Sequence, residues 1–164
     1  METIFAPWRM KYIAGEKMEG CVFCKCSVRC DDYVLYEGKN VFVMMNRYPY
    51  VSGHLMIIPN RHTGNYEELS QKERTEIFNL LEISFRALRE AMNPAGFNVG
   101  MNIGKAAGAG IEEHVHLHVI PRWEGDTNFM SVVGNVRVIP EDVATTAAKL
   151  VPLFKKISSG GMMR

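Results

Sequence analysis

The sequence lacks the features of membrane, fibrous and disordered proteins. Its longest apolar stretches, such as Val41–Met45 and Leu55–Ile58, have the length of strands, whereas a membrane helix needs about 18 apolar residues. With 14 glycines and 7 prolines in 164 residues, the chain is neither collagen-like nor of low complexity. A chain of this length can close one hydrophobic core, so we expect a single domain over residues 1–164.

An excess of charge of either sign is also missing. The chain carries 19 Lys and Arg residues against 18 Asp and Glu residues. Without an overall electrostatic field, binding to nucleic acid or to an acidic membrane is not expected. A polyanionic ligand would have to be held by local groups.

Cysteine occurs in one short segment. All four cysteines fall within ten residues, at Cys21, Cys24, Cys26 and Cys30. Such clustering favours a metal site or reduced thiols over a disulfide framework. The N-terminal segment lacks the pattern of an export signal, because Pro7 and Arg9 interrupt it. Together these features predict a cytoplasmic protein.

Apolar patterning predicts an α+β domain with an antiparallel sheet. Short apolar and β-branched runs predict five strands, at Tyr33–Tyr36, Val41–Asn46, His54–Ile58, Phe97–Asn102 and His114–Ile120. The turn at Glu37–Asn40 joins the first two strands in a hairpin, and Pro59 ends the third. Strands and helices do not alternate regularly, which argues against a parallel sheet. Residues 1–32 are expected to form an irregular arm, and residues 158–164 a flexible tail.

Two helices complete the predicted domain. Helical spacing of apolar residues extends over Tyr66–Met92, with a capping box in the pattern Ser70-x-x-Glu73 and a stop at Asn93-Pro94. A last helix starts near Pro140, and Pro152 should kink or shorten it. Its predicted buried stripe comprises Val143, Ala147, Leu150, Val151 and Phe154.

Histidine and apolar residues alternate along His114–Ile120. Alternate side chains of a strand share a face, so the histidines should line a pocket while the apolar residues enter the core. The histidines are His114, His116 and His118, and the apolar residues are Val115, Leu117 and Val119. Stacked imidazoles suit either a catalytic metal or nucleophilic catalysis on phosphorus, in which one ring nitrogen attacks. The alternative without function is an amphipathic strand whose histidines face solvent.

A glycine-rich loop, Gly104–Gly110, precedes the histidines. Its glycines, among them Gly108 and Gly110, leave backbone N–H groups accessible for an anion-binding nest. Lys105 in the loop and Arg122 after the histidines would add positive charge. The alternatives are a flexible connection and a solvated lysine. Beside the histidines, the loop favours a phosphate ligand and therefore nucleophilic catalysis.

The segment HVHLHVI resembles the signature of the histidine triad family of nucleotide hydrolases and transferases, His-φ-His-φ-His-φ-φ with φ apolar. The likeness extends from Trp8-Arg9 to about Phe154. Both Pro121-Arg122-Trp123 and the arm Ala6–Ile13 resemble the branch that acts on diadenosine polyphosphates, including its phosphorylases. The resemblance implies a homodimer, a nucleotide substrate and no catalytic metal at the nucleophile.

The resemblance also implies roles for the matching residues. His116 would be the nucleophile that forms a nucleotidyl-histidine, His118 would contact the phosphate and assist the leaving group, and His54 would support the array. Asn46 would bind ribose, and Asn102 would contact the phosphate region.

Other implied positions lie near a dimer interface. Segments after the triad would cross that interface and help form the nucleobase pocket, with Trp123, Phe129 and Met130 as candidates. Satellite packing under loops is the alternative for these apolar side chains.

The chain departs from the family in the loop before the triad. Many members have Gly-Gln-Ser/Thr there, with a hydroxyl for the phosphate, whereas this chain has Gly108-Ala109-Gly110. Backbone N–H groups would supply the contact, and a nest with a cation suits inorganic phosphate. With the resemblance to the phosphorylases, this favours phosphorolysis of diadenosine tetraphosphate to ATP and ADP. Hydrolysis of dinucleoside polyphosphates or of nucleoside phosphoramidates is the alternative.

The first two cysteines have the knuckle spacing of a zinc site. Two imidazoles from elsewhere would complete a closed tetrahedron of the structural kind. The resemblance to some family members implies the ligand set Cys21, Cys24, His62 and His114. An all-cysteine site and reduced thiols without metal are the alternatives.

Two other functions stay open from the sequence. A zinc hydrolase would use all three triad imidazoles as ligands. A nucleotide-binding or partner-docking module would keep the fold without turnover, although every triad position is intact.

Overall fold

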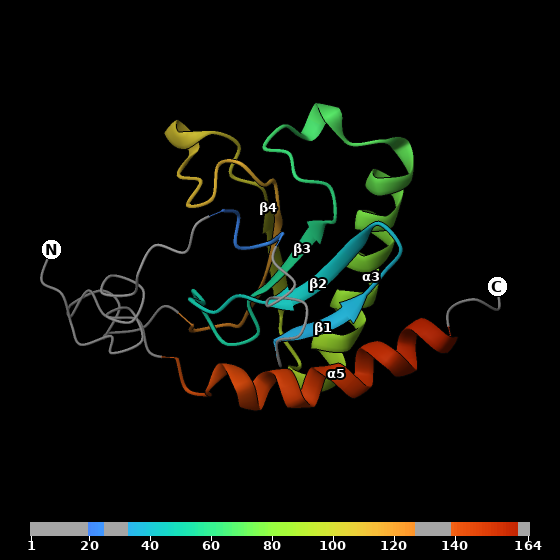
Figure 1. The fold of residues 1–164 in the computed structure, drawn as a ribbon. Helices are drawn as coiled ribbons and strands as arrows, with labels where there is room; N and C mark the ends of the chain where they lie inside the picture. The colour runs from blue at the N-terminus through green and yellow to red at the C-terminus, as the bar shows by residue number, and fades with distance from the viewer. Residues whose placement is uncertain (1–19, 25–32, 127–138, 161–164) are drawn as a thin grey trace, which may run out of the picture.

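The computed structural model describes residues 20–24, 33–126 and 139–160 (Figure 1). Predictions that concern Cys26, Cys30, Phe129, Met130 and most of the N-terminal arm lie outside these ranges.

A five-stranded antiparallel sheet forms the centre of the described chain. Its strands are β1 (Val34–Glu37), β2 (Val41–Met45), β3 (Leu55–Pro59), β4 (Gly96–Gly100) and β5 (Leu117–Arg122). They lie in the order β1-β2-β3-β5-β4, and every neighbouring pair is antiparallel. The predicted antiparallel α+β architecture is confirmed, and β4 lies at one edge of the sheet.

Most predicted strand boundaries are off by one to three residues. Pro59 is the last residue of β3 and pairs with Val41, whereas β4 spans Gly96–Gly100 and stops short of residue 102. Strand β5 starts at Leu117 instead of His114. Ile57 faces Leu117, so the same register would set Pro59 opposite Val115, and proline has no N–H to continue the ladder. The N–H of Val115 instead donates to the carbonyl oxygen of Thr63 at 2.7 Å.

Helix α3 (Gln71–Met92) follows the short 3₁₀ helix η1 (Tyr66–Glu68). Both hydrogen bonds of the predicted Ser70–Glu73 capping box are present, and Asn93 ends the helix in the left-handed conformation with φ 47°. The capping box explains why α3 begins at Gln71 instead of Tyr66, because Ser70 has extended backbone angles and accepts from the N–H of Glu73.

Helix α5 (Val143–Gly160) begins later and ends later than predicted. Asp142 accepts a hydrogen bond from the N–H of Thr145 at 3.2 Å, and this contact stabilises the first turn. Pro152 does not shorten the helix, because it lies on the exposed face, where water can reach the carbonyl group that loses its partner. Residues 158–160, predicted as tail, are helical.

Two apolar clusters pack on the two faces of the sheet. Helices α3 and α5 cover one face, where Val115, Leu117 and Val119 enter the larger cluster as predicted (Figure 1). The opposite face carries a smaller cluster formed by Cys21, Phe23, Phe42, Met44, Met56 and Ile58. Residues 20–24 therefore lie against the sheet on the side away from α3, and they reach the face to which the histidines belong.

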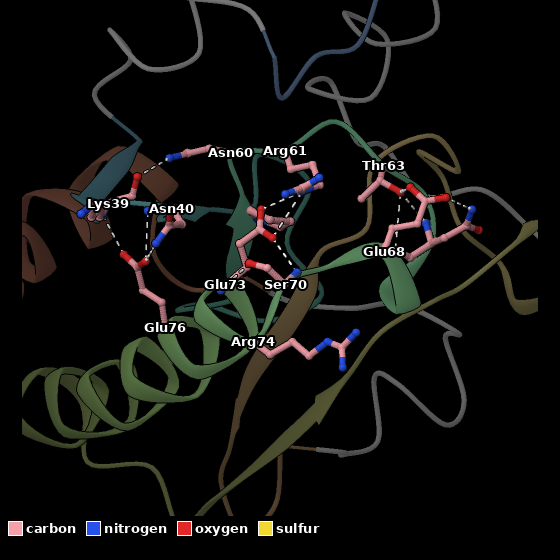
Figure 2. Close-up of polar contacts among 12 residues, drawn as sticks. Lys39, Asn40, Asn60, Arg61, Thr63, Glu68, Ser70, Glu73, Arg74 and Glu76 are labelled. Carbon is pink, nitrogen blue, oxygen red and sulfur yellow. Dashed lines mark hydrogen bonds and ion pairs between the residues drawn. The ribbon is translucent and has the colours of Figure 1, made fainter.

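Polar contacts fix the segments around the start of α3 (Figure 2). The carboxylate of Glu76 accepts from the backbone N–H groups of Lys39 at 2.7 Å and Asn40 at 3.0 Å. Arg61 pairs with the buried carboxylate of Glu73 at 3.0 Å. This ion pair ties α3 to the chain directly before His62.

None of the helices in the described ranges is long and apolar enough to cross a membrane.

Candidate active site

His116 presents one ring nitrogen with a lone pair. Its side chain is 6% exposed, and its Nδ1 lies 2.9 Å from the backbone oxygen of His114. A carbonyl oxygen only accepts, so Nδ1 carries the proton and Nε2 keeps its lone pair. Burial lowers the pKa of His116 although the carbonyl contact opposes this effect, so the ring is neutral near pH 7. A neutral imidazole of this kind can attack phosphorus.

Two successive hydrogen bonds link the backbone of Tyr50 through His54 to His118. The backbone N–H of Tyr50 donates to Nδ1 of His54 at 3.1 Å, and Nε2 of His54 lies 2.9 Å from Nδ1 of His118. Because the backbone N–H can only donate, His54 is protonated on Nε2 and donates to His118. His118 therefore carries its own proton on Nε2.

His118 is a neutral donor beside the candidate nucleophile. Burial, with a smaller effect of His116, lowers the pKa of His118 to about 4. Its ring centroid lies 4.8 Å from that of His116 and 5.1 Å from that of His54. The Nε2–H group can donate to an oxygen of a phosphoryl group bound at His116.

One of the two asparagines predicted to contact nucleotide lies beside a histidine. Asn46 accepts from the N–H of Tyr48 at 2.9 Å, and its Nδ2 lies 3.4 Å from Nδ1 of His54. Asn102 follows the end of β4, where Gly100 pairs with His118. The contacts of both amides with ribose and phosphate stay predictions.

The glycine-rich loop forms a short 3₁₀ helix, η2 (Lys105–Ala107), flanked by Gly104 and Gly108. Both glycines have positive φ angles, 77° and 83°, which glycine adopts without strain. Lys105 is exposed, and Gly110 lines an open hollow together with Gly20 and Val22 of the cysteine segment. Anion binding by this loop stays a prediction.

Arg122 and Trp123 hold the far end of β5. The guanidinium group of Arg122 forms two hydrogen bonds with Asp126, at 2.5 and 2.8 Å, and a third with Asn98 at 2.7 Å. Trp123 donates from Nε1 to the carbonyl oxygen of Met92 at 3.2 Å. Arg122 lies four residues beyond His118, about 13 Å along an extended strand. The structure therefore places Arg122 in an ion pair with Asp126, and its role as an anion partner stays a prediction.

The cysteine segment and two histidines form a compact group of metal-ligating atoms. One atom from each of Cys21, Cys24, His62 and His114 lies within 4.8 Å of all the others. Sulfur-to-Nδ1 distances are 3.3 Å for Cys21–His114, 3.3 Å for Cys24–His62 and 3.5 Å for Cys24–His114. A tetrahedral zinc site with bonds of about 2.0–2.3 Å has edges of about 3.5 Å, so this geometry fits zinc.

The backbone sets the orientation of His114 toward the cysteines. Its Nε2 lies 2.8 Å from the carbonyl oxygen of Pro59, so Nε2 carries the proton and the lone pair of Nδ1 points at the sulfur atoms. Burial lowers the pKa of His114, which favours the neutral form that binds a metal.

The three triad imidazoles do not converge on one point. Nδ1 of His114 faces the thiols, Nδ1 of His116 faces a backbone carbonyl oxygen, and Nδ1 of His118 faces another imidazole. This arrangement contradicts the zinc hydrolase with three triad ligands.

Two aromatic residues at the site were missed by the sequence analysis. The ring of Phe23 packs against His114 and His116, and the ring of Tyr50 stacks on His54 with centroids 4.9 Å apart. Both lie in short irregular segments beside predicted site residues, the cysteine pair and His54. That position was the available signal, since neither residue belongs to a periodic run.

Comparisons with known proteins agree with this geometry. The HIT domain matches residues 28–125. An AP-4-A phosphorylase of Mycobacterium tuberculosis is 34% identical over 152 residues, which cover 86% of this chain and 78% of the relative. A bis(5'-adenosyl)-triphosphatase of Saccharomyces cerevisiae is 31% identical over 94 residues, or 57% of this chain and 45% of that protein. The crystal structure of a Zn-bound histidine triad family protein from Mycobacterium smegmatis has a TM-score of 0.69 and 29% identity, covering 85% of this chain and 96% of that one.

The chain belongs to the HIT, or histidine triad, family. Its family and its relatives of known activity class it as an enzyme. The resemblance drawn from the HVHLHVI segment is thereby confirmed.

Proposed function

We propose that this protein cleaves diadenosine tetraphosphate, or a related dinucleoside polyphosphate, through a covalent nucleotidyl-histidine at His116. The observation that carries the proposal is the neutral His116 ring with its Nε2 lone pair, beside the Nε2–H donor of His118. The similarity to an AP-4-A phosphorylase supports the substrate class.

The reaction has two steps. Nε2 of His116 attacks the phosphorus atom next to one adenosine, a P–N bond forms, and the P–O bond to the leaving ATP breaks with its electron pair on oxygen. The Nε2–H of His118 donates a hydrogen bond to the oxygen where negative charge develops. An acceptor oxygen then attacks the same phosphorus atom and returns His116 to its neutral form.

Inorganic phosphate is the proposed acceptor, so the second product is ADP. The similarity to the phosphorylase and the glycine-rich segment Gly104–Gly110 with Lys105 support this choice. Water as the acceptor would give AMP, and the similarity to a bis(5'-adenosyl)-triphosphatase keeps hydrolysis as the second candidate.

Product analysis tests the proposal. Diadenosine tetraphosphate is incubated with the protein at zero and at millimolar phosphate, and the products are separated by chromatography. We expect ATP and ADP in amounts that depend on phosphate. ATP and AMP at ratios independent of phosphate would establish the hydrolase instead. Nucleotide binding without any product would establish a binding module.

A structural zinc ion is proposed at Cys21, Cys24, His62 and His114. The fit of the four ligand atoms to a tetrahedron supports it, as does the similarity to a Zn-bound family member. The site is closed by four protein ligands, so zinc would tie residues 20–24 to the sheet and contribute to folding.

A homodimer through the β4 edge is also proposed. In the described part of the chain β4 pairs with β5 alone, which leaves one row of backbone groups for a second copy. Val99 on β4 and Phe78 on α3 are 41% and 62% exposed, and the rings of Phe85 on α3 and Phe97 on β4 are in contact, with centroids 4.5 Å apart. Exposed apolar side chains of this kind favour an interface. Light scattering should give twice the chain mass for the wild type and a monomer for Val99→Lys. A monomeric wild type would contradict the dimer.

A further inference from the structure

Phe23 links the proposed metal site to the candidate nucleophile. It lies between Cys21 and Cys24 and is 4% exposed. Its ring centroid is 5.4 Å from that of His114, edge-on at 83°, and 5.1 Å from that of His116, tilted by 59°. One buried side chain thus contacts a metal-ligating imidazole and the catalytic imidazole together.

The His116 ring needs support beyond its hydrogen bond to the backbone of His114. The contact from Nδ1 to the His114 carbonyl oxygen directs one nitrogen, but the ring can still tilt about this contact. Phe23 covers the ring from one element, and His118 meets it nearly at a right angle, 76°, from another. Packing on the ring limits its tilt and therefore sets the direction of the Nε2 lone pair.

The position of Phe23 depends on the turn that carries it. The N–H of Cys24 donates to the carbonyl oxygen of Cys21 at 3.3 Å, and the two sulfur atoms face His62 and His114. Residues 20–24 contain no strand or helix of their own. The metal ligands and the small apolar cluster therefore hold this turn, and Phe23 with it, against the sheet.

We propose that Phe23 is a positioning residue for His116, and that the cysteine turn holds the Phe23 ring where it orients the nucleophile. This inference rests on the proposed function for its kinetic consequence. A metal ion at the four ligands would act on catalysis only through this turn and through the backbone of His114. Phe23 itself touches no reacting atom.

A matched pair of variants tests the inference in the full-length protein. Phe23→Leu removes the ring that contacts the histidines. Phe42→Leu removes a ring from β2 in the same apolar cluster and leaves a similar cavity. Zinc content, the urea midpoint of unfolding, kcat and KM are measured for both. If Phe23→Leu does not fold, Phe23→Met replaces it under the same criteria, because methionine fills nearly the same length without a ring.

We expect both variants to lose stability and to retain one zinc ion per chain. Only Phe23→Leu should lower kcat, at least tenfold, with KM within about threefold of the wild-type value, since small misplacements of a reacting group have large rate effects. Long-range ¹H–¹⁵N spectra at one pH should show His116 as the Nδ1–H tautomer in the wild type and in Phe42→Leu. A mixture of tautomers is expected in Phe23→Leu.

The inference is overturned if Phe23→Leu matches Phe42→Leu in kcat and leaves the His116 signals unchanged. The spectra need no substrate, so they separate this failure from a failure of the proposed function. A wild-type protein that cleaves no dinucleoside polyphosphate would refute the proposed function. The tautomer spectra alone would then decide the role of Phe23.

Discussion

His114 and His116 are two residues apart, yet the structure prepares their imidazoles for opposite tasks. In His114 a backbone carbonyl oxygen binds Nε2, which leaves the Nδ1 lone pair for the thiols. In His116 a backbone carbonyl oxygen binds Nδ1, which leaves the Nε2 lone pair for the substrate face. The same kind of partner on opposite ring nitrogens separates the proposed metal ligand from the proposed nucleophile. The difference shows that a histidine's task follows from its second hydrogen bond.

The largest effect is expected when the imidazole of the candidate nucleophile, His116, is removed. His116→Gly removes the covalent route itself, so the steady-state rate with diadenosine tetraphosphate should fall by more than about 10⁴-fold, beyond the typical loss of a general acid or base. The zinc content and the thermal midpoint should stay near the wild-type values. A variant that keeps a tenth of the wild-type rate would show that another group attacks.

The variant Cys24→Ser tests the proposed metal ligands. Loss of one thiolate should weaken zinc binding and lower the thermal midpoint by roughly 10 °C, because metal binding contributes to folding. Activity per folded molecule should fall less than in His116→Gly, since the proposed metal ligands would act on catalysis only through the position of Phe23 and the backbone of His114. Elemental analysis and calorimetry check both points, with Cys30→Ser as the control. Equal destabilisation by Cys30→Ser, or wild-type protein without transition metal, would refute the ligand set.

Loss of the hydrogen bond from His54 to His118 should have an intermediate effect. His54→Ala removes the donor to Nδ1 of His118, so the Nε2 proton of His118 is no longer enforced. We expect kcat to fall about 10²-fold, in the range of lost acid or base assistance. The wild-type rate in His54→Ala would mean that the hydrogen bond between the two rings is structural.

The smallest effect concerns the ion pair beside His62. Hydrogen bonds from Arg61 and Ser70 outweigh the effect of burial and lower the pKa of Glu73 below its ordinary value. A carboxyl group with a lower pKa in the folded state stabilises the fold above its unfolded pKa, and this contribution disappears as the pH falls through the folded pKa. Glu73→Gln keeps a capping-box side chain but loses the ion pair, at a cost of about 1 kcal/mol near pH 7.

Urea unfolding at pH 7 and pH 3 checks this prediction. The free-energy difference between wild type and Glu73→Gln should be present at pH 7 and much smaller at pH 3. A difference that is the same at both pH values would show that the charge of Glu73 contributes nothing.

Periodic features of the sequence predicted most of the fold. The alternation along His114–Ile120 correctly separated the core face from the histidine face, and the capping box at Ser70–Glu73 marked the start of α3. Predicted strand boundaries were wrong where a residue far away in the sequence determined them. Strand β5 starts late because Pro59, more than fifty residues earlier, cannot donate to Val115.

The residues of the candidate site also differ in how far the sequence could predict them. Residue type and spacing were enough to select the cysteine pair and the triad, whereas His62 and His114 entered the proposed ligand set through the resemblance to family members. The contact of Arg122 with Asn98 could not be predicted, because it forms only once β4 and β5 are paired. Phe23 was missed because its proposed role depends on a ring contact across 93 residues of chain to His116.

The central claim is that Nε2 of His116 forms a covalent bond to the nucleotide. The most direct measurement is the intact mass of the protein, quenched within the first turnovers with diadenosine tetraphosphate in phosphate-free buffer, followed by peptide mapping of the adduct. The account predicts one added adenylyl group per chain, located on His116 and discharged when phosphate is supplied. An adduct on another residue, or rapid turnover without any adduct under these conditions, would contradict it.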